Sequence, residues 1–456
     1  MDTAYRGLPT ELLEYILDIL SKQQEFVTLK GCSYVNRFFC VLSQTHLLRN
    51  VTFSEENGSV TISPYTKVAL AAYNPALHFL DVLEFSPHLV SYIHGLTLIC
   101  TWVATSPGSP TSEHWLQNDS ELPRLFPLLV HLRRLSVSGK RFQSPRKLYR
   151  PRRWTTFSDD FRTTLITVLA SNNLTELDIT GLGLFPFNLF RYCLSLKKLS
   201  IATFDVDDPN HQSDTSIDRP KFVMVPNANG PSPSCQLEYL HLEDVSNRDN
   251  ELTRFLSPTC PLDISHLRIL SVFPESSDEM ENIAKFSTIT KNLAHLRIDT
   301  DYSQVHTSYN TLSYTLHRHF TPPPDLRGFE SLHSLTIDAK FTIRIFHHRI
   351  LIDYFTSPIP WIIQLLQEAS WASPSGPTHL SHLTLNLSFI GFPPDLTKLL
   401  HNNWVELVRC VSKRHFPHFS TLELNIIGLD PVGLTVLRKD EALQELAAEG
   451  GLILIS

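Results

Sequence analysis

The sequence predicts an α/β fold in which short parallel strands stack into a solenoid, with helices and loops on its convex side. The main observation is a phrase, apolar-x-x-Leu-x-apolar, that recurs about ten times from residue 93 onward. A strand this short cannot bury its apolar face alone, so its copies are expected to stack on one another. The phrases are Ile93/Leu96/Leu98, Leu132/Leu135/Val137, Leu174/Leu177/Ile179, Leu196/Leu199/Ile201, Leu237/Leu240/Leu242, Leu267/Leu270/Val272, Leu293/Leu296/Ile298, Leu332/Leu335/Ile337, Leu380/Leu383/Leu385 and Phe419/Leu422/Leu424.

The segments between the phrases supply the second observation. Residues 161–170, 361–369 and 395–414 carry apolar side chains at helical spacing, which predicts helices on the convex side. A last helix over 440–449 is followed by a Gly-Gly stop and a short apolar segment. Residues 140–153, 205–235 and 301–325 have the composition of exposed loops. The loop at 140–153 is basic, which is typical either of a patch for an acidic ligand or localisation signal, or of a solvated loop.

The phrase resembles the strand segment of leucine-rich repeats, where the apolar residues point inward and the two residues flanking the middle Leu point outward. Only the intervals of 22 residues (Leu174 to Leu196) and 26 residues (Leu267 to Leu293) fall within the 20 to 29 residues of ordinary repeats. The Asn that usually follows at the ninth position is absent. The resemblance therefore implies an irregular leucine-rich-repeat solenoid, with parallel strands on its concave face.

The first fifty residues contain two further apolar patterns. Leu8-Pro9 precedes a helical pattern of apolar residues, and a second helical segment leads into Val35-Asn36-Arg37-Phe38-Phe39. Together they resemble an F-box, although many members of that family have Cys-Arg-x-Trp where this chain has Asn36-Arg37-Phe38. Residues 79–89 are also similar to a segment of fungal-type F-box proteins. The alternative is an ordinary helical cap for the solenoid.

The two resemblances together imply a domain plan and a role. Residues 1–55 would form the F-box, 56–92 a helical linker or cap, and 93–456 the repeats. In that family the F-box docks on the Skp adaptor of a cullin ubiquitin ligase and the repeats hold a protein substrate. The residues expected to contact the adaptor are Leu8, Pro9, Leu12, Ile16, Leu17, Leu20, Val35 and Phe38. The competing hypothesis is a non-catalytic interaction scaffold with no role in ubiquitylation.

Composition and charge constrain the class of partner and the cellular location that we expect for the protein. The 456 residues carry a formal net charge of −7, which does not favour a nucleic-acid partner. No apolar run reaches the ~18 residues of a membrane span, and the acidic first twenty residues do not form a signal peptide. Seven cysteines without a C-x-x-C pair favour a reduced intracellular location, cytoplasmic or nuclear.

Motifs for catalysis and cofactors are missing from the sequence. It contains no Gly-rich phosphate loop, G-x-S-x-G or H-E-x-x-H. The histidine pairs, such as His379-x-x-His382 and His415-x-x-His418, have no second ligand pair at the spacing of a zinc site, so we expect solvent-facing or loop histidines and no bound metal. We therefore predict a protein that is not an enzyme and needs no cofactor.

The outward positions of the strands are the candidate binding residues for the protein target. They are chemically mixed, and mixed surfaces usually depend on a few aromatic or Arg anchors. The sequence does not identify the target. The residues predicted to contact it are Arg134, Lys198, Tyr239, His241, His295 and Arg297.

Overall fold

The computed structural model divides into two compact units, residues 1–235 (unit 1) and 236–456 (unit 2). It describes residues 9–455 apart from internal gaps. The gaps are 24, 55–58, 62–66, 70–74, 103–115, 117–118, 142–151, 155–156, 203–204, 207–234, 244–250, 275–276, 301–322, 343–344, 347–348, 351–357, 371–378, 391–400, 413–414 and 430. Within the described residues, no helix has the length and apolar character needed to cross a membrane.

Three short helices open unit 1. They are α1 (Thr10–Lys22), α2 (Phe26–Ser33) and α3 (Arg37–Leu47). Helix α1 begins directly after Pro9, and α3 begins at Asn36, whose side chain accepts a hydrogen bond from the Phe39 amide at 2.9 Å. Leu17 and Leu29 are fully buried among these helices. The predicted pair of N-terminal helical patterns is therefore present as a three-helix segment.

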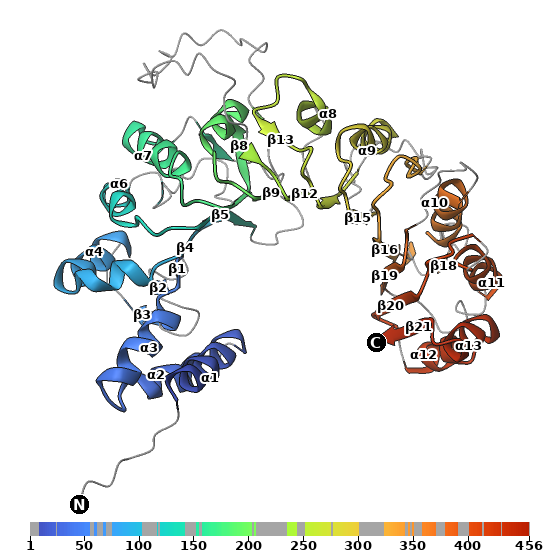
Figure 1. Cartoon of the computed structure of the whole chain (residues 1–456), viewed down its shortest axis with the longest axis horizontal. Coiled ribbons are helices and arrows are strands. Elements are labelled where there is room, and N and C mark those ends of the chain that lie inside the picture. Colours follow the sequence, from blue (N-terminus) through green and yellow to red (C-terminus); the bar gives the residue numbers. More distant parts are fainter. Residues whose placement is uncertain are drawn as a thin grey trace, which may run out of the picture. The chain divides into compact units, whose positions relative to one another are not determined.

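A parallel sheet follows in unit 1 (Figure 1). In the order of pairing, its parallel strands are β1 (Asn50–Ser54), β4 (Gly95–Trp102), β5 (Arg134–Arg141), β7 (Glu176–Thr180) and β9 (Lys198–Ala202). The antiparallel strands β2 (Ser59–Thr61) and β3 (Lys67–Ala69) extend the sheet beyond β1. The middle apolar residues of the parallel strands share one register and are buried, which defines the inward face of the sheet.

The start of this sheet differs from the sequence prediction. Strand β1 pairs with β4, Val51 opposite Leu96, so the sheet begins within the first 55 residues rather than at residue 93. The pattern Leu48-x-x-Val51-x-Phe53 was missed because Val replaces the middle Leu. The segment 56–92, expected to be helical, holds β2 and β3 before α4 (Pro75–Phe85) and the 3₁₀ helix η2 (Pro87–Tyr92).

The remaining elements of unit 1 connect the strands. They are α6 (Leu122–Leu125), η3 (Phe126–Leu128), α7 (Asp159–Leu169), η5 (Phe187–Tyr192), and a small parallel sheet of β6 (Arg152–Arg153), β8 (Leu182–Phe185) and β10 (Asp205–Val206). Helix α7 matches the helix predicted over 161–170. The hydroxyl of Ser158 accepts from the Phe161 amide, and Phe161, Leu165 and Leu169 are buried on one face. The Phe161 ring lies 6.1 Å from the ring of Phe126 in η3, so α7 packs against its neighbouring helices.

Unit 2 repeats the strand-and-helix arrangement. Its parallel strands are β12 (Tyr239–Glu243), β14 (Ile269–Val272), β15 (His295–Asp299), β16 (Ser334–Thr342), β19 (His382–Ile390), β20 (Thr421–Ile427) and β21 (Leu452–Ile455). The middle leucines of the predicted phrases occupy one register and are at most 1% exposed. The predicted α/β class and the parallel-strand solenoid are thus confirmed.

Helices cover the inward side of the unit 2 strands. They are α8 (Glu251–Leu256), α9 (Ser277–Ile289), α10 (Ile359–Ser370), α11 (His401–Cys410), α12 (Pro431–Arg438) and α13 (Glu441–Ala448). Figure 1 shows α10, α11 and α13 on the same side of β16, β19 and β20. Trp404 and Leu365 are buried there. Two short pairings complete the described elements: β11 (Cys235–Gln236) with β13 (Leu262–Asp263), and β17 (Ile345–Phe346) with β18 (Arg349–Ile350).

Candidate binding surface

The side chains that alternate with the buried leucines of unit 2 form a solvent-facing surface, which we call the strand face. Alternation follows from the strand period of two, since successive side chains point to opposite sides of a sheet. In-register pairing brings residues that are 39 to 48 positions apart in the chain onto neighbouring strands of one row, as with Asp338 opposite Asn386 and Asn386 opposite Asn425. Neighbouring strands lie about 4.8 Å apart, so side chains in one row can bond to one another.

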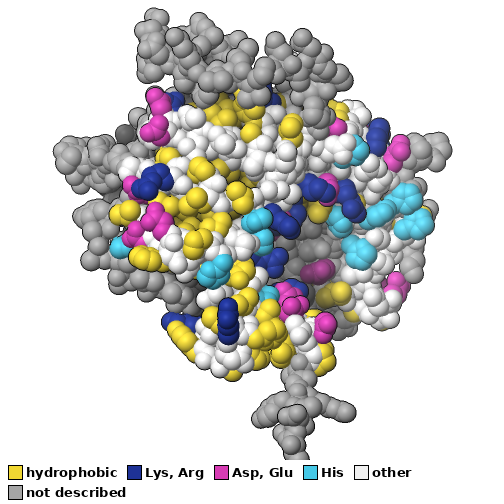
Figure 2. All heavy atoms as spheres, turned by 60° about the vertical axis from the view of Figure 1, so that its left-hand side comes forward, with side chains coloured by type: hydrophobic (Ala, Val, Ile, Leu, Met, Phe, Trp, Pro, Cys, Tyr) yellow, Lys and Arg dark blue, Asp and Glu magenta, His cyan; other side chains and the backbone are white. Residues whose placement is uncertain are grey.

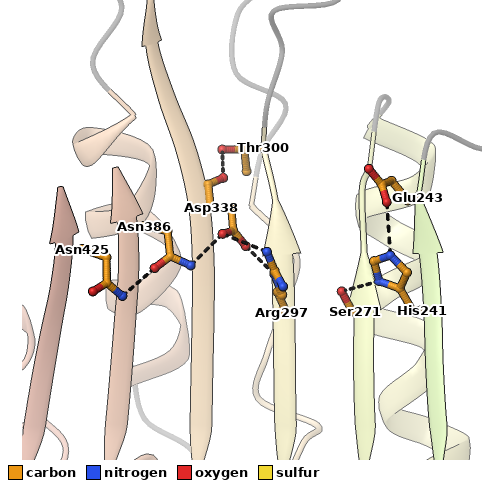
Figure 3. A network of polar contacts seen from close by, with 8 residues as sticks. All are labelled: His241, Glu243, Ser271, Arg297, Thr300, Asp338, Asn386 and Asn425. Atoms are coloured by element: carbon orange, nitrogen blue, oxygen red, sulfur yellow. Dashed lines mark hydrogen bonds and ion pairs between the residues drawn. The ribbon is translucent and has the colours of Figure 1, made fainter. Parts of the chain in front are cut away.

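A polar ladder joins two neighbouring rows of the strand face (Figure 3). Arg297 donates from Nε to Asp338 Oδ2 at 2.6 Å and from Nη2 to Asp338 Oδ1 at 3.1 Å. Asn386 Nδ2 donates to Asp338 Oδ1 at 2.6 Å, and Asn425 Nδ2 donates to Asn386 Oδ1 at 2.7 Å. The ladder therefore runs across β15, β16, β19 and β20.

The Arg297–Asp338 pair is the strongest contact of the ladder because both carboxylate oxygens accept from the planar guanidinium. The hydrogen bond to Asp338 raises the pKa of Arg297, against a smaller lowering by burial. The Arg297 side chain is 51% exposed and the Asp338 side chain 16%, so solvent screens the pair only in part. The Thr300 amide and hydroxyl both donate to the Asp338 carbonyl, at 2.7 and 2.9 Å, which fixes the backbone beneath the pair.

His241 forms a separate polar cluster on the two preceding strands. Its Nδ1 lies 2.8 Å from Ser271 Oγ, and its Nε2 lies 3.3 Å from Glu243 Oε2 (Figure 3). The hydrogen bond from His241 lowers the pKa of Glu243, burial opposes that shift, and the charges of His241 and Arg297 add to it. Both ring nitrogens of His241 are therefore engaged by neighbouring side chains.

The predicted target-binding residues fall into local groups rather than one. In unit 1, Lys198 Nζ lies 2.8 Å from Glu176 Oε1, and Arg134 Nε lies 4.0 Å from Glu176 Oε2. In unit 2, Arg297 and His241 are held as described, Tyr239 is half-buried and His295 is exposed. Sequence reasoning missed Glu176 and Asp338 as partners of these cations. Strand register was the signal that could have found them.

The N-terminal three-helix segment presents a second candidate surface, made of apolar side chains. Of the residues expected to contact an adaptor, Pro9, Leu12, Ile16, Val35 and Phe38 are exposed, Leu20 is partly exposed, Leu17 is buried, and Leu8 lies outside the described residues. Further exposed apolar side chains that the sequence analysis did not name are Tyr15, Val27, Tyr34 and Val41. Large apolar side chains in this density on a short segment indicate an interaction surface.

Metal ligands and cysteine thiols are two kinds of reactive group among the described residues. Within them, no group of three or more His, Cys, Asp or Glu side chains is arranged to hold a metal ion. Burial raises the pKa of the Cys193 thiol to about 12 and that of Cys260 to about 11, so neither thiol is poised as a nucleophile.

Comparisons with known proteins add one structural likeness. No protein-family model matches the chain, and no curated protein is significantly similar to it. An internalin from Listeria monocytogenes is 12% identical in sequence, and the alignment covers 80% of this chain and 93% of the internalin at a TM-score of 0.27. At that TM-score the likeness carries no argument about fold or function.

Proposed function

We propose that this protein is a non-catalytic recognition subunit of a Skp-cullin-F-box type ubiquitin ligase. Its N-terminal helices would dock on the Skp adaptor, which binds the cullin scaffold, and its repeat strands would hold a protein target. Ubiquitin transfer would then belong to other subunits. The proposal includes a cytoplasmic or nuclear location and no nucleic-acid or membrane partner.

The exposed apolar side chains of α1 and α3 carry the proposal. The side chains of Ile16 and Phe38 are 44% and 43% exposed. By contrast, Leu17 of α1 and Leu29 of the neighbouring helix α2 are fully buried. The segment therefore has its own core and still leaves large apolar groups in water. Completing the burial of one such side chain contributes roughly 1 kcal/mol, about half of the 1.5–3 kcal/mol for full burial. A partner surface that covers several of them gains useful affinity.

Purified full-length protein and Skp adaptor provide the test, with affinity measured by calorimetry. The double variant Ile16→Ala/Phe38→Ala should bind about tenfold or more weakly, since about 2 kcal/mol of apolar contact is lost. The matched control Leu128→Ala/Val130→Ala removes two side chains of similar exposure elsewhere in unit 1 and should bind normally. Leu8→Ala/Pro9→Ala should weaken binding as well. Unchanged affinity of the first variant, with its helical signal intact, would contradict the proposal.

A second measurement separates a ligase subunit from a scaffold. Affinity purification from cells should recover the adaptor together with the cullin, and the recovered complex should modify a co-purified protein with ubiquitin. Recovery of the adaptor alone, with no cullin and no modified protein, would favour the scaffold hypothesis instead.

A further inference from the structure

Histidines gather along one edge of the unit 2 sheet, where its parallel strands begin. Each lies at the first residue of a strand or up to three residues before it, and each is exposed. Parallel strands begin at the same edge, so register brings these residues together although the chain separates them. We call this row the histidine edge, and it consists of His266, His295, His333, His379, His382 and His418.

Ring contacts join three histidines of the edge. The His379 ring stacks on His418 with centroids 5.6 Å apart and planes 19° from parallel, and it meets His333 edge-on at 5.7 Å. Burial lowers the pKa of His295, and the nearby charges of His333, Arg268 and His382 lower it further. Figure 2 shows histidine side chains gathered side by side on one face of the molecule.

Other charged groups at this edge are few and of both signs. Arg268, Lys291 and Glu330 are exposed there, and Glu238 is half-buried before β12. His382 Nδ1 lies 2.7 Å from the Ser381 hydroxyl. Among the described residues, His78 lies close to the Asp81 carboxylate and His241 close to the Glu243 carboxylate, and neither histidine belongs to the edge. The edge is therefore close to neutral when its histidines are neutral, and cationic when they are protonated.

Protonation of its histidines would make this short row cationic. Histidine is the side chain that ordinarily changes charge between pH 5 and 8, so a row of six becomes more positive as the pH falls through that range. The row crosses the five strands β14 to β20 at about 4.8 Å per step, so it is about 19 Å long, the length of roughly six extended residues.

We propose that the histidine edge binds an acidic segment of a protein partner, about six residues long and rich in Asp or Glu, and binds it more tightly as pH falls from about 7.5 to 6. Charge complementarity identifies this occupant, because a cationic row of this length pairs with a run of carboxylates. This inference rests on the proposed function of the repeats as the target-binding part, and names the chemistry of the target and a pH control.

The test uses the full-length protein and a fluorescent decapeptide with six consecutive glutamates. Fluorescence anisotropy is measured in 150 mM salt with a chelator at pH 7.5 and 6.0. We expect the peptide to bind at least tenfold more tightly at pH 6.0, and a decapeptide with glutamines in place of glutamates not to bind. Equal affinity for the acidic peptide at the two pH values would overturn the proposal.

Two variants assign the effect to the stacked pair. His379→Asn/His418→Asn, which removes two of the six histidines, should lose part of the gain at pH 6.0, whereas His379→Lys/His418→Lys should bind more tightly than the unmodified protein at pH 7.5. The matched control His78→Asn/His88→Asn, which removes two histidines of unit 1, should behave as the unmodified protein does. A pH response of unchanged size in the His379→Asn/His418→Asn variant would refute the role of the edge.

The remaining arms address other anionic partners. A twelve-residue oligouridylate and vesicles containing phosphatidylserine are titrated under the same conditions, and tighter binding of either than of the acidic peptide would overturn the choice of a protein partner. Adaptor affinity is measured on the same samples. If the acidic peptide does not bind while the adaptor still does, only this inference is refuted. The proposed function is tested separately, by adaptor binding to the Ile16→Ala/Phe38→Ala variant.

Discussion

Replacing Leu296 with Ala tests whether the middle leucines hold the solenoid together. Leu296 is 1% exposed in the centre of β15, and its register neighbours Leu270 and Leu335 are fully buried. Truncating a buried Leu to Ala costs about 2–5 kcal/mol, depending on how far the cavity collapses. Strand pairing on both sides fixes the backbone here, so little collapse is expected. We therefore predict a loss of about 3–5 kcal/mol in the free energy of unfolding.

Two outward positions in one row of the sheet serve as controls. Thr336 is half-buried on the strand face in register with Arg297, and Thr336→Ala should change the unfolding free energy by less than about 0.5 kcal/mol. Arg297→Ala should cost about 0.5–1.5 kcal/mol, because it removes a bidentate but half-exposed ion pair with Asp338. The expected order of destabilisation is therefore Leu296, Arg297, Thr336.

Urea unfolding at 25 °C, followed by circular dichroism, measures these differences. Tryptophan fluorescence adds a probe of unit 2, where Trp361 and Trp404 are buried. The comparison requires that the dependence on urea be the same in all three variants. If Thr336→Ala destabilised the protein as much as Leu296→Ala, the assignment of inward and outward positions would be refuted.

Two further predictions concern a glycine pair and a histidine. Gly428→Ala should destabilise the protein by about 2 kcal/mol or more, since its φ is +80° and a Cβ would lie 2.3 Å from the Phe389 carbonyl oxygen. Gly450→Ala should cost only about 1 kcal/mol, because its φ is +74° but a Cβ there meets open space. Thermal melting of the two variants measures this order. The pKa of His295 is lower in the folded protein than in the unfolded chain, so the unfolded chain binds more protons below about pH 7. The free energy of unfolding therefore decreases as the pH falls. His295→Asn should thus lose less melting temperature between pH 7.5 and 5.5 than the unmodified protein; an equal loss would show that His295 does not contribute.

Most of the parallel strands could be predicted because each must bury three apolar side chains at the same spacing. Each of the ten predicted phrases contains a strand of the sheet in its unit, and its two outer apolar residues and middle Leu are all buried. Two parallel strands of these sheets, β1 and β21, were not predicted because they lack part of that pattern. Strand β1 has Val51 in the middle position, and β21 follows Gly450 and Gly451 without the first apolar residue.

The polar contacts could not be predicted from the sequence, because they depend on register between distant segments. The predicted outward residues were limited to the two that flank each middle Leu. Strands β16 and β19 continue beyond the phrase, so Asp338 and Asn386 occupy a third outward row. The histidines were similarly recognised only as pairs close in sequence. His379 and His418 stack across neighbouring strands although 39 residues separate them.

The polar ladder and the histidine edge differ in how much of their bonding capacity is available to a partner. Arg297, Asp338, Asn386 and Asn425 satisfy one another, so a ligand that used the Arg297 guanidinium would first have to disrupt a bidentate ion pair. Such a ladder stabilises a rigid platform, and a rigid platform lowers the entropy lost on binding. The histidines beside it are exposed and can accept protons without breaking an internal ion pair. We therefore expect a partner of unit 2 to bind the histidine edge. Arg297, in the neighbouring ladder, would stabilise the surface rather than contact the partner.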